Sequence, residues 1–197
     1  MNRLRLLSIA AFFLVSCASP SQQLPSVVPG KLFEGGYIDV RAPQSEGWQL
    51  AESSSRGMGF RKPGVASGES FGAQVLFFEL PPAQTPEQFV ELMKEGMRKD
   101  TDPVRFDVIE SSTTYTEERE YPCARHHGVL NDKQARTSPT TKEQLVLEMY
   151  SLYCRHPLRT NTGFAAIYSY RGRGRYPALD KEAQDFIKGV QVPAAKS

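Results

Sequence analysis

The chain has 197 residues, 40% of them hydrophobic, and its 24 basic and 22 acidic side chains give a formal net charge of +2. Arg3 and Arg5 lie in an apolar leader, and without them the basic and acidic residues number 22 each. A neutral chain lacks the positive field that nucleic-acid binding needs, so we expect no nucleic-acid partner. The length fits one domain with a sizeable core.

The first sixteen residues have the order of a signal peptide, because a short basic start is followed by an apolar run from Leu6 to Val15. This run is shorter than the about 20 residues that cross a bilayer as a helix, and no later segment approaches that length. We therefore expect residues 1–16 to be removed on export and no transmembrane helix to remain.

The leader ends in Leu14-Val15-Ser16-Cys17, which resembles the lipobox of bacterial lipoproteins. The resemblance implies that Cys17 receives a thioether-linked diacylglycerol, that cleavage makes it the first residue, and that its amino group is acylated with chains such as palmitate. Several acyl chains, at about 0.8 kcal/mol per buried methylene, form a durable membrane anchor. The alternative is an ordinary secretory signal with a chance cysteine.

The residues after Cys17 predict the location and layout of the mature chain. In lipoproteins an aspartate after the cysteine favours inner-membrane retention, whereas Ala18-Ser19 follow here. We therefore expect a lipid anchor in the outer membrane, with the protein facing the periplasm. Residues 17–30 are rich in Pro, Ser and Gln and predict an acylated, flexible tether. Residues 31–197 are expected to form a single domain.

Two amphipathic helices are predicted among strand-like segments. The first helix starts with Thr85 as N-cap, Pro86 in the first helical position and Gln88 three residues after the cap. Its apolar stripe is Phe89, Leu92, Met93, Gly96 and Met97, which we expect to pack in the core. The alternative is that the methionines form an adaptable binding face. The second helix is expected over 177–190, with Leu179, Ala183, Phe186, Ile187 and Val190 on one face.

The expected strands are 37–40, 47–50, 58–61, 71–80, 106–115, 124–130, 144–153 and 164–170. The polar segment 131–142 is expected to be an exposed loop.

This order predicts an α+β fold, in which helices cover an antiparallel sheet, rather than repeated βαβ units. Three parts of the chain resemble PsbP-like proteins: Tyr37-Ile38-Asp39-Val40 with Gly47-Trp48-Gln49-Leu50, the helix start Thr85-Pro86-Glu87-Gln88-Phe89, and the strand-helix end over 164–190. The resemblance implies an α/β/α sandwich that supports binding and assembly. It brings no shared catalytic residues to this chain.

Cys123 and Cys154 are the cysteines that remain besides Cys17, and an oxidising envelope compartment favours a disulfide between them. If the strands around the polar segment form a hairpin, the midpoint of this pair falls between Ser138 and Pro139, at the centre of the segment. A bond that closes about 30 residues stabilises by roughly 3 to 4 kcal/mol. The alternative, a redox-active pair, lacks a C-x-x-C motif.

His126, His127 and His156 are the three histidines of the chain. Adjacent strand residues point to opposite faces, so His126 and His127 cannot readily bind one metal ion together. We expect solvated or hydrogen-bonded histidines, no metal site and no cofactor.

Arg171, Arg173 and Arg175 alternate with glycines between Tyr170 and Tyr176. Guanidinium forks and glycine backbone can hold phosphate or carboxylate, so we expect these arginines to form one anion-contacting edge. Its ligand would be lipid A phosphate or an acidic partner. The alternative is a connector of solvated arginines.

The chain lacks the sequence motifs of common catalytic sites, including G-x-S-x-G, the P-loop and H-E-x-x-H. We therefore expect a non-catalytic binding or assembly accessory protein of the envelope, whose partner is an envelope protein or an anionic envelope component. The alternative is an envelope hydrolase in which the fold brings a histidine to a Ser or Asp. A pocket that holds a histidine within hydrogen-bond reach of a nucleophile would favour the hydrolase.

Overall fold

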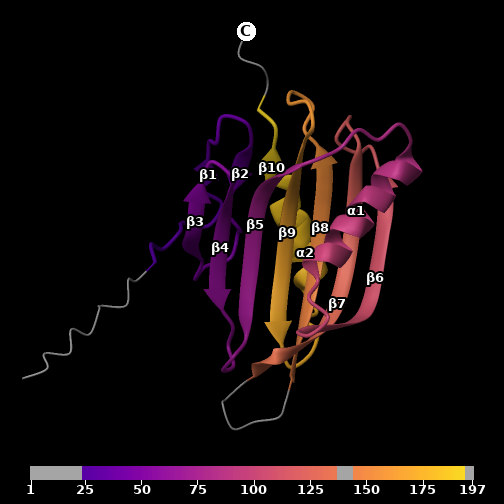
Figure 1. The fold of residues 1–197 in the computed structure, drawn as a ribbon. Helices are drawn as coiled ribbons and strands as arrows, with labels where there is room; N and C mark the ends of the chain where they lie inside the picture. The colour runs from indigo at the N-terminus through magenta and orange to yellow at the C-terminus, as the bar shows by residue number, and fades with distance from the viewer. Residues whose placement is uncertain (1–23, 137–143, 194–197) are drawn as a thin grey trace, which may run out of the picture.

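Seven antiparallel strands form one large sheet in the order β3-β4-β5-β9-β8-β7-β6 (Figure 1). The computed structural model describes residues 24–136 and 144–193. A smaller sheet has the order β1-β2-β10. The strands are β1 (Leu32–Phe33), β2 (Asp39–Arg41), β3 (Gln49–Ser54), β4 (Gly57–Pro63), β5 (Ser70–Glu79), β6 (Phe106–Thr116), β7 (Cys123–Arg136), β8 (Gln144–Arg155), β9 (Thr162–Gly172) and β10 (Val190–Gln191). The helices are α1 (Pro86–Asp100) and α2 (Leu179–Lys188).

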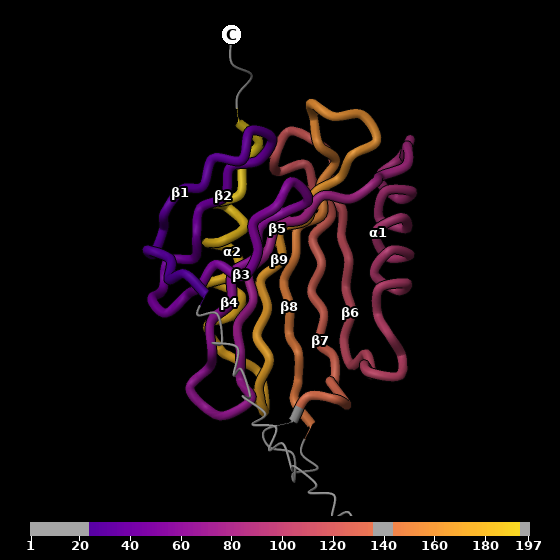
Figure 2. The backbone as a smooth tube through the Cα atoms, turned by 60° about the vertical axis from the view of Figure 1, so that its left-hand side comes forward, coloured from indigo at the N-terminus to yellow at the C-terminus, as the bar shows by residue number. Residues whose placement is uncertain are grey.

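The two helices lie on opposite faces of the large sheet (Figure 2). Helix α1 packs against β6 and β7, whereas α2 packs against β8 and β9. Because side chains alternate along a strand, Cys154 joins the core beneath α2 while its neighbour Tyr153 packs against the core beneath α1. The expected α+β class, with an antiparallel sheet between two helices in an α/β/α sandwich, is confirmed.

The cores on the two faces differ in size. The face beneath α2 buries many aromatic side chains, among them Trp48, Phe60, Phe71, Tyr168 and Phe186. The face beneath α1 buries a small cluster of Leu80, Phe89, Met93 and Ala124. Since each large apolar side chain contributes about 1.5 to 3 kcal/mol on full burial, the α2 face supplies most of the hydrophobic stabilisation.

Helix α1 starts as its sequence predicts. Thr85 is the N-cap and its hydroxyl accepts a hydrogen bond from the Gln88 backbone N–H at 3.2 Å, while Pro86 occupies the first helical position. The Gln88 side chain in turn accepts from the backbone N–H of Gln84 at 2.8 Å. The predicted stripe is buried only in its first half, at Phe89 and Met93, whereas Met97 is partly exposed. The C-terminal half of α1 is therefore incompletely packed against the sheet.

Helix α2 is shorter than predicted. Its buried residues are Leu179, Ala183, Phe186 and Ile187, as expected. Val190, however, belongs to β10 and pairs with Val40 of β2. The chain leaves the helix at Gly189, where a Cβ atom would lie 2.9 Å from the Cβ of Arg41. A glycine at this position allows the helix end to approach β2 closely.

The domain begins before residue 31, so the predicted boundary between tether and domain is wrong. The Val27 backbone N–H donates to the Trp48 carbonyl, and the Leu50 N–H donates to the Pro25 carbonyl, both at 2.9 Å. Ser26 forms a bridge to Gln49. Val27 is buried in the core beneath α2, and its burial holds this segment against β3. The earlier part of the expected tether, residues 17–23, lies outside the described residues.

The expected exposed loop over 131–142 is also partly wrong. Strand β7 continues to Arg136 and β8 begins at Gln144. Asn131, Asp132 and Arg136 pair with β8, with a shift of register between the last two, so residues 131–136 belong to the strand. Asp132 is fully buried in this stretch. Two arginines compensate its charge, and these contacts could not be read from the local composition. Residues 137–142 lie outside the described part of the chain.

Candidate functional site

The predicted lipid attachment site, Cys17, lies outside the described residues, as does the whole predicted signal peptide. Within 24–136 and 144–193, no helix is long and apolar enough to cross a membrane. The lipid anchor therefore stays a prediction.

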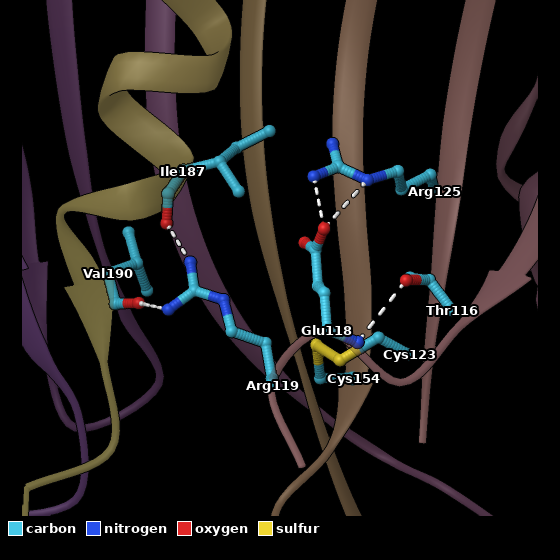
Figure 3. Close-up of a disulfide and its surroundings, with 8 residues drawn as sticks. All are labelled: Thr116, Glu118, Arg119, Cys123, Arg125, Cys154, Ile187 and Val190. Atoms are coloured by element: carbon cyan, nitrogen blue, oxygen red, sulfur yellow. Dashed lines mark hydrogen bonds and ion pairs between the residues drawn. A yellow bond between two sulfur atoms is a disulfide. The ribbon is translucent and has the colours of Figure 1, made fainter. Parts of the chain in front are cut away.

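The expected disulfide joins β7 to β8. Cys123 and Cys154 are direct cross-strand partners, both fully buried, with an S–S distance of 2.05 Å and a Cα–Cα distance of 4.1 Å (Figure 3). In the turn just before Cys123, the Arg119 guanidinium donates to the backbone carbonyls of Ile187 and Val190 (Figure 3). The bond thus lies in the core, where it connects β7 to β8 close to the end of α2.

The adjacent histidines point to opposite faces, as predicted. His126 lies on the α1 face, where its Nδ1 is 3.1 Å from the Thr113 hydroxyl. Burial lowers the pKa of His126, so its ring is neutral at pH 7. Thr113 and His126 thus place a hydroxyl beside a neutral imidazole, and no carboxylate of the described chain bonds the ring.

His127 belongs to a polar network on the α2 face. Its Nε2 lies 2.9 Å from Oε1 of Glu148, a buried carboxylate, and its ring stacks on Tyr150 with centroids 4.4 Å apart. Burial, followed by the charge of Glu148, raises the pKa of Tyr150. Sequence reasoning missed Glu148, although extension of the Cys123–Cys154 register places Tyr150 opposite His127 and Glu148 two residues away on the same face.

His156 directly follows β8, and both nitrogens of its ring bond to backbone groups. Its Nε2 lies 3.1 Å from the Tyr37 carbonyl oxygen, and its Nδ1 accepts from the Leu158 backbone N–H at 3.2 Å. No set of three or more potential metal ligands gathers in the part of the chain that the structure describes.

Arg171 is held by a buried carboxylate on the α1 face. Its Nε lies 3.3 Å from Oδ2 of Asp132, and Arg105 donates two hydrogen bonds to the same carboxylate at 3.1 and 2.8 Å. Burial alone would raise the pKa of Asp132, but Arg105, Arg171 and two backbone N–H groups outweigh it and hold this pKa below its ordinary value. Asp132 is therefore a charged, structural centre between two arginines.

Arg175 lies on the opposite side of the sheet. It forms an ion pair with Glu110 and interacts electrostatically with Glu148 and Tyr150, which lie on the α2 face. Arg171, in contrast, pairs across strands with Leu147 and faces α1. The expectation that Arg171, Arg173 and Arg175 form one edge is wrong, because alternation along β9 and the following turn sends Arg171 and Arg175 to different faces. Anion binding by this segment stays a prediction.

A groove lies between the C-terminal half of α1 and the sheet, with a volume of about 600 Å³. This volume falls within the range of ordinary ligand sites. One wall is Met97 of α1. Its floor consists mainly of apolar side chains from four neighbouring strands: Leu76, Leu130, Leu147, Met149 and Ile167.

A glycine in the floor deepens this groove, and polar side chains line part of it. Gly128 lies in its floor, and a Cβ atom there would come within 2.8 Å of Nε2 of His126. His126 itself lines the groove, while Lys94 and Arg98 of α1 lie at its rim. Sequence reasoning assigned the methionines of α1 to core packing. The groove exists because Met97, at the C-terminal end of the α1 stripe, is only partly covered, which no local pattern encodes.

No protein-family model matches the chain. No curated protein matches it by sequence. Among solved structures, it is similar to cyanobacterial PsbP (CyanoP) from Synechocystis sp. PCC 6803, with a TM-score of 0.43, 10% identity, and coverage of 91% of this chain and 99% of that one. It is also similar to LpqN, described as involved in cell envelope biogenesis of Mycobacterium tuberculosis, with a TM-score of 0.39, 14% identity, and coverage of 85% and 84%.

Proposed function

We propose that this protein is a lipid-anchored accessory protein of the bacterial envelope that acts by binding and carries out no catalysis. The signal peptide and the lipobox ending in Cys17 support the anchor and the envelope location. The residues that follow Cys17 support the outer membrane, with the domain on its periplasmic side. Its partner is another envelope protein or an anionic envelope component.

The groove beneath α1 is the observation that carries the binding function. Several of its apolar side chains, including Leu76, Met97, Leu147, Met149 and Ile167, remain partly exposed in the folded domain. A concave, mainly apolar surface with a few polar groups is the usual form of a binding site. The basic side chains at the rim, Lys94 and Arg98, favour a partner that carries negative charge beside its apolar part.

Site-specific photocrosslinking in intact cells tests this proposal. A photoreactive phenylalanine analogue replaces Met97 in the groove, and in a control it replaces Leu158, an apolar residue that is 61% exposed elsewhere. We expect a defined adduct from position 97 and none from position 158. Adding Gly128→Phe, which fills the groove floor, should abolish that adduct. Equal adducts from both positions, or an adduct that survives the filled groove, would show that the groove is not the binding site.

The hydrolase alternative is a second candidate, and the Thr113–His126 pair favours it. A hydroxyl 3.1 Å from a neutral imidazole has the geometry of a nucleophile and its base. The test is hydrolysis of short- and medium-chain p-nitrophenyl esters by the wild type, Thr113→Val and His126→Ala. Turnover by the wild type that both substitutions remove would establish the hydrolase. On the binding proposal, the three proteins hydrolyse the esters at the same background rate.

A further inference from the structure

Strand β6 forms an open edge of the large sheet (Figure 1). It pairs with β7 on one side, and no described residue pairs with it on the other. An eleven-residue strand presents an edge of about 36 Å, along which half of the backbone N–H and C=O groups point outward. Residues Asp107 to Ser112 are all exposed, so this edge is open to a further strand.

The opposite edge of the sheet, at β3, is partly covered by another segment of the chain. Along the first half of β3, the segment from Pro25 to Val27 lies beside the strand and bonds to Trp48 and Leu50. Ser26 completes this cover with a bridge to Gln49. The chain thus covers one edge with its own N-terminal segment and, in its described ranges, leaves β6 uncovered.

β6 has a bulge between Val108 and Glu110 and two acidic side chains, but from Ser111 to Thr116 it is regular and uncharged and lacks the features that commonly prevent edge-to-edge pairing. The strand contains no proline, lysine or arginine. Val108 and Ile109, at its irregularity, are 57% and 55% exposed. An exposed edge that carries apolar side chains favours association with another strand.

The charges of β6 are neutralised from within the domain. Asp107 bonds Lys133 at 2.8 Å, and Glu110 pairs with Arg175. The stretch Ser111–Thr114 between these acidic residues and the end of the strand has only hydroxyl side chains. Two β6 strands can therefore approach each other without bringing unpaired like charges together.

We propose that β6 is a docking edge for the β6 strand of a second copy of this chain. The two strands pair antiparallel about a twofold axis near Ser112, so that each copy donates and accepts the same main-chain hydrogen bonds. Antiparallel pairing places Val108 and Ile109 of one copy beside the threonine and tyrosine side chains at the far end of the other β6. The two large sheets then become one continuous sheet.

Cysteine crosslinking in native membranes tests the pairing on the full-length, membrane-bound protein. Ser112→Cys places a thiol at the proposed axis, and Ser53→Cys places an equally exposed thiol on β3, at the opposite edge. After mild oxidation we expect Ser112→Cys to give a species of twice the monomer mass on a non-reducing gel, and Ser53→Cys to stay monomeric. Reductant should return the dimer to monomer.

A matched pair of charge substitutions shows whether the crosslink reports β6 pairing. Ile109→Lys adds a charge to the edge, whereas Leu158→Lys adds one at a similarly exposed residue elsewhere. In the Ser112→Cys background we expect the first to reduce the dimer at least fivefold and the second to leave it unchanged. Both variants should retain the melting temperature of their parent.

Three results would overturn the proposal. The first is a monomeric Ser112→Cys protein under oxidation. The second is an equal dimer yield from Ser112→Cys and Ser53→Cys, which would indicate random collision. The third is a crosslink from Ser112→Cys to a protein of different mass, which would show that the edge receives a strand of another protein.

Discussion

Cys123 and Cys154 are direct cross-strand partners at the end of the β7–β8 pairing, and a disulfide joins them in the core. The bond closes a chain segment of 31 residues, which includes the hairpin tip. We predict that the double substitution Cys123→Ala, Cys154→Ala lowers the free energy of unfolding by about 3 to 4 kcal/mol, because the unfolded chain regains the entropy of an open loop. Urea denaturation measures the change.

The wild-type protein in reductant is the control for this substitution. Its loss of stability should be close to that of the double alanine variant, since both remove the same crosslink. Quantitative alkylation of both cysteines in unreduced wild-type protein would contradict the disulfide itself.

The buried carboxylate of Asp132 should contribute strongly to stability at neutral pH. Asp132→Asn removes the negative charge that Arg105 and Arg171 share. Because both arginine side chains are about one third exposed and stay partly hydrated, we expect a loss of about 1.5 to 3 kcal/mol. Asp107→Asn is the matched control, because that side chain is 61% exposed and its ion pair with Lys133 should matter little. Thermal or urea unfolding at pH 7 measures both.

The effect of Asp132→Asn should depend on pH in a defined direction. The pKa of Asp132 is lower in the folded protein than its ordinary value, so the unfolded chain binds the proton more readily. The stabilisation is complete above the ordinary aspartate pKa, about 3.9, and is lost as the pH falls through the lower value of the folded state. The gap between wild type and variant should therefore shrink below about pH 4. A gap that widens as the pH falls would reverse the assigned direction.

Phe89 lies in the smaller core beneath α1 and Phe186 in the larger core beneath α2, so substitutions at these residues test the stability of each core. Each is 2% exposed, and replacement by aspartate removes an aromatic side chain and buries an unpaired charge. We expect each change to cost several kcal/mol, with the larger loss for Phe186→Asp because it lies in the larger core beneath α2. Lys94→Gln, on the exposed side of α1, should be nearly neutral. Equal melting temperatures for all three variants would mean that the helix faces are assigned wrongly.

Cys17→Ala tests the lipid anchor. The thioether requires the cysteine sulfur, so metabolic labelling with palmitate should lose its band in this variant. Ser8→Ala, which lies in the apolar run outside Leu14–Cys17 and keeps the cysteine, is the control and should retain the label. Incorporation of label into Cys17→Ala would contradict the lipobox.

The elements of this fold were predictable where their causes lie close together in the chain. The start of α1 depends on Thr85, Pro86 and Gln88, which interact within one turn. The β7–β8 pairing was predictable because two cysteines lie symmetrically around a polar segment. The separation of His126 from His127 follows from strand alternation alone.

Other features depend on residues that are far apart in sequence. Asp132 looked like part of a polar loop, but it is buried because Arg105 and Arg171 reach it from two other segments. The regular spacing of Arg171, Arg173 and Arg175 suggested one charged edge. Their different faces become evident only when the sheet places Asp132 beside Arg171 on one side and Glu148 near Arg175 on the other.

The sequence by itself thus determined the α+β class, the disulfide and the faces of both helices, because capping, periodicity and cysteine number act over short distances or through covalent chemistry. Only the tertiary structure decided where the domain begins, which charges are buried, and where a groove and an open sheet edge remain. Those outcomes depend on whether elements that are far apart in the sequence cover one another fully in the fold. The segment from Pro25 to Val27 covers the edge at β3, whereas no described segment covers β6. Likewise, α1 buries Phe89 against the sheet but leaves Met97 partly exposed.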